Sequence, residues 1–96
     1  MISNKDDSYS TDDTQLATYL YLQGFKITDI DYSDPQRAKF VFHQNGDESN
    51  DINKLHEHAY LFRTMKTKVE PSDYIKKYRR LCSIVRRQAE WHEGIL

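Results

Sequence analysis

The sequence has little cysteine, glycine or proline, and it has no long hydrophobic run. Its single cysteine, Cys82, cannot close an intramolecular disulfide, which favours a reducing compartment such as the cytosol. No stretch approaches the roughly 18 consecutive apolar residues that a membrane-spanning helix needs. Residues 1–7 are polar and acidic, unlike a signal peptide. We therefore expect a cytoplasmic protein that makes no contact with a membrane.

The common catalytic motifs are also missing. The three glycines form no phosphate-binding loop, and neither a nucleophile elbow nor a His-Glu-x-x-His motif occurs. Cys82 occupies an apolar position of a predicted helix, which predicts a buried and unreactive thiol. Asp29, Asp31 and Asp34 lie in a predicted hairpin, where carboxylates typically protect an edge strand from aggregation. We expect no enzymatic activity and no cofactor.

The histidine spacing argues against a metal site. His56 and His58 lie two residues apart on a predicted helix, so their side chains should point about 200° away from each other. His43 belongs to a strand face that points away from the core, and His92 lies near the end of the sequence. A single cysteine cannot complete a zinc site with such scattered histidines. The sequence therefore predicts no bound metal.

The sequence does contain enough apolar surface for one small core. Its 96 residues are 38% hydrophobic and 12% aromatic, which is typical of a folded protein even though 30% of the residues are charged. This length suits one domain. Residues 1–8 have no apolar run after Ile2, and we expect a flexible N-terminal tail there. Residues 9–96 are expected to form the single domain.

The first predicted helix covers residues 12–23. Residues 10–13, Ser-Thr-Asp-Asp, supply a capping side chain and acidic residues for its first turn, where they complement the helix dipole. Gly24 suits the left-handed position that ends many helices, and Phe25 suits the hydrophobic residue that follows it. A short additional strand is expected near Tyr9.

An antiparallel hairpin is predicted after this helix. Residues 26–32 contain strand-forming residues whose alternation slips, which indicates a bulge or an edge strand. Residues 38–44 are the strongest strand, with Ala38, Phe40 and Phe42 on one face. The intervening Ser-Asp-Pro sequence favours a turn.

Two further helices complete the predicted fold. The first covers residues 50–65, with Ser49 or Asn50 as its cap, and the second covers residues 71–91, beginning at Pro71. The apolar face of the predicted helix 50–65 consists of Ile52, Leu55, His56, Ala59, Tyr60 and Phe62. The sequence thus predicts a small α+β domain in the order α-β-β-α-α, with the hairpin packed on the helices.

The last predicted helix has two contrasting faces. At about 100° per residue, one side carries an apolar stripe that should face the core. This stripe consists of Tyr74, Tyr78, Leu81, Cys82, Val85 and Ala89. The opposite side, here called the basic face, carries Lys76, Arg79, Arg80, Arg86 and Arg87. Because guanidinium groups bind phosphate and carboxylate alike, this face suits a nucleic-acid backbone or an acidic protein surface.

The charge distribution leaves two interpretations of the basic face open. The net charge is −1, but residues 1–65 carry six Lys/Arg against eleven Asp/Glu, and residues 66–96 carry eight against four. In one interpretation the two halves attract each other, or the charges are simply solvated. In the other, the bases form a binding surface.

Several short segments resemble a known family. They are Ser10-Thr11-Asp12, Leu16-Ala17, Tyr19-Leu20, Gly24-Phe25-Lys26, Ile30-Asp31, Asp34-Pro35 and Phe40-Val41-Phe42. Together they resemble DUF5659, an uncharacterised small domain family of phages and mobile elements, over roughly residues 9–85. The resemblance implies a viral accessory or virion-associated protein that acts in the cytoplasm of a bacterial host. It supplies no catalytic residue.

We therefore expect a non-enzymatic interaction module that docks on a protein partner, from host or virus, or on another copy of itself. The alternative is a nucleic-acid-binding protein that uses the same basic face. The two hypotheses differ in their dependence on salt, because binding to phosphates releases counterions and weakens steeply as salt rises. A small hydrolase or metal enzyme would require a concave cluster of acids or histidines that the sequence does not indicate.

Overall fold

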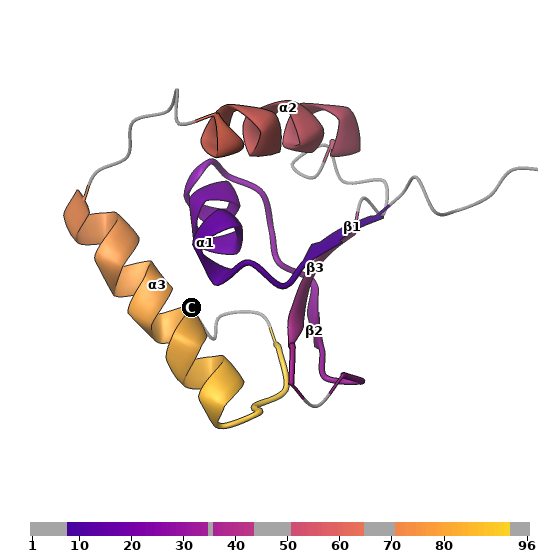
Figure 1. Ribbon diagram of the computed structural model, residues 1–96, viewed down its shortest axis with the longest axis vertical. Coiled ribbons are helices and arrows are strands. Elements are labelled where there is room, and N and C mark those ends of the chain that lie inside the picture. Colours follow the sequence, from indigo (N-terminus) through magenta and orange to yellow (C-terminus); the bar gives the residue numbers. More distant parts are fainter. Residues whose placement is uncertain (1–7, 35, 44–50, 65–70, 93–96) are drawn as a thin grey trace, which may run out of the picture.

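Three strands and three helices form the computed structural model (Figure 1), which describes residues 8–34, 36–43, 51–64 and 71–92. In chain order they are β1 (Ser8–Thr11), α1 (Thr14–Leu22), β2 (Asp29–Asp31), β3 (Lys39–His43), α2 (Ile52–Arg63) and α3 (Pro71–Arg86). The predicted α+β class is confirmed, and β1 is the short strand expected near Tyr9. Ser8, assigned to the tail from the sequence, belongs to β1, whereas residues 1–7 lie outside the described residues.

The three strands form an antiparallel sheet in the order β1-β3-β2. The predicted hairpin is confirmed, with Ile30 of β2 opposite Phe40 of β3. On the other side of β3, Phe42 lies opposite Tyr9 of β1. Phe40 and Phe42 are buried on one face, as their alternation predicts. β2 lies at an edge of the sheet, as one of the two predicted alternatives had it, but it spans three residues and is shorter than the predicted segment 26–32.

α1 is the central helix of the fold. It lies between the sheet and α3, with α2 packed along another side (Figure 1). Its central residues are therefore buried almost all round, including the polar Thr18, whose hydroxyl donates to the Thr14 carbonyl oxygen at 2.7 Å. Leu16 and Leu20 are fully buried and contribute to the same core as Phe40 and Phe42.

Both ends of α1 are determined by local side chains and backbone. The carboxylate of Asp13 accepts hydrogen bonds from the backbone nitrogens of Gln15 and Leu16. Asp13 is thus the cap itself, which corrects the expectation of acidic residues inside the first turn. At the other end Gly24 adopts a φ of 104°, and the Phe25 nitrogen donates to the Leu20 carbonyl oxygen, as predicted.

α2 begins and ends inside its predicted range. Its cap is Asp51, whose carboxylate accepts hydrogen bonds from the backbone nitrogens of Asn53 and Lys54. The predicted caps, Ser49 and Asn50, lie outside the described residues. The helix buries Ile52, Leu55 and Ala59. Two predicted members of its apolar face are wrong, because His56 is exposed and Tyr60 is 63% exposed. Both lie at the border of the buried stripe, where the side chain reaches solvent.

α3 ends at Arg86, five residues before its predicted end at residue 91. Gln88 adopts a φ of 52°, and the nitrogen of Ala89 donates to the Ile84 carbonyl oxygen, which closes the helix. The chain then turns back, and the Tyr32 hydroxyl donates to the Ala89 carbonyl oxygen at 2.6 Å. No glycine or proline marks this end, so local sequence patterns did not predict it.

The core stripe of α3 also differs from its prediction. Leu81 and Ile84 are fully buried, whereas Cys82 and Val85 are only partly buried. Ile84 was absent from the predicted stripe, and the expectation of a buried Cys82 is wrong. The direction midway between Leu81 and Ile84 lies about 70° around the helix from Val85, the predicted centre. The helix is rotated because its inner face packs on α1.

This rotation predicts a difference between two neighbouring truncations. Ile84→Ala should lower the free energy of unfolding by about 2–4 kcal/mol, because it leaves a cavity in the core. Val85→Ala should cost clearly less, because its side chain already reaches solvent. Urea denaturation measures both. An equal or larger loss for Val85→Ala would show that the helix has the orientation expected from the sequence.

The two left-handed residues predict opposite effects of substitution. A Cβ added at Gly24 meets no atom within 4 Å, so Gly24→Ala tests only the backbone conformation. We expect it to destabilise the protein by about 1 kcal/mol. Gln88→Gly should instead stabilise it by up to about 1 kcal/mol, because glycine adopts positive φ without the steric cost. Thermal melts of the two variants should shift in opposite directions.

Candidate functional site

The orientation of α3 is held at both ends by hydrogen bonds from tyrosines. Near its start, the Tyr74 hydroxyl donates to the Gln15 carbonyl oxygen of α1 at 3.2 Å. Beyond its end, the Tyr32 hydroxyl donates to Ala89. Burial raises the pKa of Tyr32 and of Tyr74, so both phenols stay protonated and act as donors at neutral pH. The outer side of α3 is therefore fixed relative to the rest of the fold.

All residues of the basic face are exposed on this outer side. They are Lys76, Arg79, Arg80, Arg86 and Arg87. After the rotation described above, Arg79 and Arg86 point most directly away from the core, and Arg80 and Arg87 lie toward one flank. The face extends from Lys76 to Arg87, about 16 Å along the helix axis.

No acidic residue interrupts the bases of this helix. Between Asp73, in the first turn, and Glu90, beyond the helix, the sequence contains neither aspartate nor glutamate. A solvated helix face more often alternates acids and bases at spacings of three and four residues, where opposite charges attract. Lys76 has Asp73 three residues before it, but Arg79 and Arg80 three and four residues after it, and the later bases of the basic face have no acid at those spacings within the helix. The positive charge is therefore not balanced within the helix.

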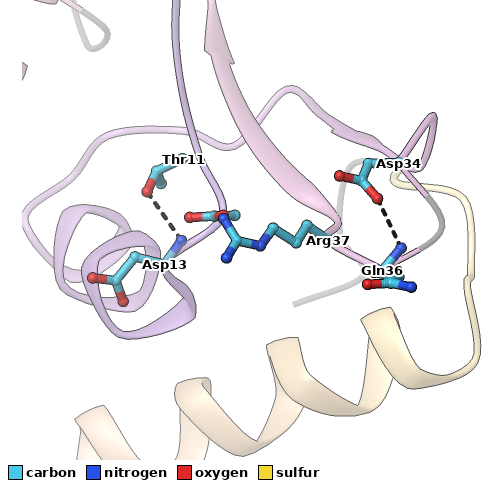
Figure 2. Close-up of polar contacts among 6 residues, drawn as sticks. Thr11, Asp13, Asp34, Gln36 and Arg37 are labelled. Atoms are coloured by element: carbon cyan, nitrogen blue, oxygen red, sulfur yellow. Dashed lines mark hydrogen bonds and ion pairs between the residues drawn. The ribbon is translucent and has the colours of Figure 1, made fainter.

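The rest of the described chain does not balance most of these charges either. The side chains of Lys76, Arg79, Arg86 and Arg87 make no hydrogen bond or ion pair with any residue that the structure describes. Arg37 behaves differently, because its Nη1 atom lies 3.0 Å from Asp12 Oδ2 in an ion pair. Figure 2 shows the Arg37 side chain extending toward the segment of Thr11 and Asp13. Within the described ranges, those four bases therefore form no ion pair with the acidic residues of the first half of the sequence.

Tyrosines border the basic face but are engaged with each other and with the protein. The rings of Tyr74 and Tyr78 are stacked, with centroids 6.2 Å apart and an interplanar angle of 7°. A hydrogen bond with Cys82 raises the pKa of Tyr78. Tyr32 is half-buried and holds the chain after α3. Its ring has a structural role.

A cleft of about 550 Å³ lies between the start of α1, the hairpin and α3. Its lining residues are Asp12, Asp13, Thr14, Gln36, Arg37, Ala38, Phe40 and Val85. Its carboxylates already have partners, since Asp13 caps α1 and Asp12 pairs with Arg37. Sequence analysis missed this cleft, because three separate segments form it. Its polar groups serve the fold, which leaves the basic face as the stronger candidate.

The histidines of α2 have separate surroundings. The His56 ring meets the edge of Tyr9 at 5.1 Å, and the His58 ring lies 5.3 Å from Phe25. His58 Nδ1 also lies 3.5 Å from the Tyr19 hydroxyl. Within the described ranges, no three His, Cys, Asp or Glu side chains gather closely enough to hold a metal ion. Over the same residues, no helix has the length and apolar character to cross a bilayer.

If the exposed bases do not take part in folding, neutralising them should leave stability unchanged. We expect Arg79→Gln with Arg86→Gln to change the free energy of unfolding by less than about 1 kcal/mol. A slight gain is expected at low salt, because repulsion among neighbouring bases decreases. Urea denaturation at about 20 and 200 mM salt measures this. A marked loss of stability would show that these arginines pair inside the fold.

Comparison with known proteins gives one match. The family model described as "Domain of unknown function (DUF5659)" matches residues 6–86. No curated protein and no solved structure matches the chain. The matched segment includes every described strand and helix.

Proposed function

The chain belongs to the DUF5659 family, and we propose that it is a non-enzymatic interaction module that binds an anionic partner through the basic face of α3. One observation carries this proposal: Lys76, Arg79 and Arg86 on α3, and Arg87 directly after it, are exposed and make no ion pair with the described residues. Charges that the protein does not neutralise itself are available to a partner.

The first candidate partner is a protein with an acidic surface, from host or virus, or another copy of this chain. Exposed apolar side chains favour a protein partner, because Ile75 is 45% exposed beside the basic face and Tyr60 and Leu61 are exposed on α2. Arginine and tyrosine are also enriched at protein interfaces. A second copy could offer the carboxylates of β2, where Asp29 and Asp31 are exposed.

The second candidate partner is nucleic acid, favoured by the number of arginines. Contacts to phosphates require exposed cations and no shaped pocket, which matches a convex helix face. For the biological setting, we propose a phage-type accessory or virion-associated protein in the cytoplasm of a bacterial host. This setting rests on the resemblance of the sequence to a family of phages and mobile elements.

Heparin chromatography tests the proposal with a general polyanion as the probe. The wild-type protein should be retained at about 100 mM salt, and Arg79→Glu with Arg87→Glu should abolish retention. Lys39→Glu with Lys54→Glu is the matched control, because it makes the same change in net charge at exposed positions outside α3. The control should remain bound. Equal loss in both double variants, or no retention of the wild type, would contradict the proposal.

A further inference from the structure

Ser83 is surrounded on α3 by four arginines. On a helix the surface neighbours of a residue are those three and four positions away in each direction. For Ser83 these positions are Arg79, Arg80, Arg86 and Arg87. Neighbours at these spacings have Cβ atoms about 5–6 Å apart, so all four side chains can reach a common point above Ser83. We call these five residues the Ser83 cluster.

The hydroxyl of Ser83 lacks the hydrogen bond that helical hydroxyls often make. Such groups commonly donate to the carbonyl oxygen four residues earlier. Thr18 in α1 does so, at 2.7 Å from the Thr14 oxygen. Ser83 makes no side-chain hydrogen bond with any residue in the described ranges, although it is half-buried. A donor is thus present at the centre of the arginines.

The groups of the cluster select a particular ligand chemistry. Arginine side chains donate hydrogen bonds and accept none, and the serine hydroxyl can donate. The ligand must therefore present several acceptor oxygens and negative charge in a small volume. A phosphate group does this, and planar guanidinium groups bind its oxygens in pairs. A single backbone phosphate offers two free oxygens, as a carboxylate does, but phosphates repeat at regular intervals along a strand, so neighbouring phosphates can share the four arginines.

We propose that the Ser83 cluster binds neighbouring phosphates of the backbone of duplex nucleic acid. This inference rests on the proposed function and names its partner. With Lys76 on the same face, the contact would extend about 16 Å along the helix, enough for about four to five phosphates in all, about one for each base. Because the contacts are to the backbone, binding is independent of base sequence.

Two observations favour a duplex over a single strand. Binding of single strands typically uses a groove with exposed aromatic rings on which bases stack. The two tyrosine rings of α3 are not free for this, since Tyr74 and Tyr78 stack on each other. α3 also presents a convex surface, with its inner side packed on α1 (Figure 1). A convex basic helix fits the regular phosphate array beside a duplex groove.

The test measures fluorescence polarisation of a labelled duplex of about 20 base pairs over a salt series, using the full chain. Four to five phosphate contacts predict a slope of log affinity against log salt of about −4, since each contributes about −0.9. Arg79→Gln with Arg87→Gln should reduce the magnitude of this slope by about 2. Thermal melts show whether each variant folds.

The central variant is Ser83→Asp, which puts a carboxylate among the four arginines. Ser72→Asp is its matched control, because it makes the same substitution at an exposed residue of α3 about 16 Å away. That distance exceeds the screening length of about 8 Å at physiological salt. We expect at least about a tenfold loss of affinity for Ser83→Asp and a much smaller loss for the control, whose only basic neighbour at these spacings on α3 is Lys76. Ser83→Ala leaves the net charge unchanged and should lower the affinity for the duplex a few-fold, because only the hydroxyl donor is removed.

Equal effects of Ser83→Asp and Ser72→Asp would overturn the proposal, as would a salt slope near zero. Tighter binding to a single strand of the same length would overturn the choice of a duplex. If a polyglutamate peptide competes as well as the duplex at equal charge, the partner is an acidic protein and the phosphate assignment is wrong. Heparin retention that persists without duplex binding refutes only this inference, whereas loss of both refutes the proposed function as well.

Discussion

The packing of α3 on α1 is the constraint on which the rest of the structure depends. Leu81 and Ile84 fill the core from α3, and their burial determines the rotation of the helix about its axis. Tyr74 and Tyr32 fix the two ends of the same segment through hydrogen bonds to backbone oxygens. Because the inner side is held in this way, the residues opposite must face solvent. The basic face is thus a consequence of where the core residues lie.

The bases of α3 cost the fold little, which explains how it can carry them. Arg86 lies in the last turn, where a positive charge interacts favourably with the helix dipole. Lys76 and Arg79 lie farther from that end, and repulsion among exposed charges is weak in water. The stability of the fold therefore depends little on the bases of α3. The stronger argument for a partner is that the chain does pair an arginine elsewhere, at Arg37 and Asp12.

Sequence patterns predicted the features that depend on neighbouring residues. The end of α1 followed from Gly24 and Phe25, and the inward face of β3 followed from the alternation of Phe40 and Phe42. Such features need only local hydrogen bonds or a regular repeat. The five exposed bases of α3 were also placed together correctly, because charged side chains on a helix rarely turn inward.

The errors concern features that distant segments determine. The predicted core stripe of α3 included Tyr78 and Cys82 and omitted Ile84, because periodicity alone cannot show which side of the helix packs on α1. Its early end depends on Gln88 and on the distant Tyr32.

The separation of charge in the fold bears on how a partner would approach. Exposed carboxylates lie at the start of α1 and along the hairpin, including Asp12, Asp31 and Asp34, whereas α3 carries only bases beyond its first turn. With a net charge of −1, the whole molecule has no general attraction to a polyanion. Attraction arises only when α3 faces the partner, because the acidic side is repelled. The separation of charge therefore orients the protein so that α3 faces the polyanion. The contact then depends on the few side chains of the Ser83 cluster.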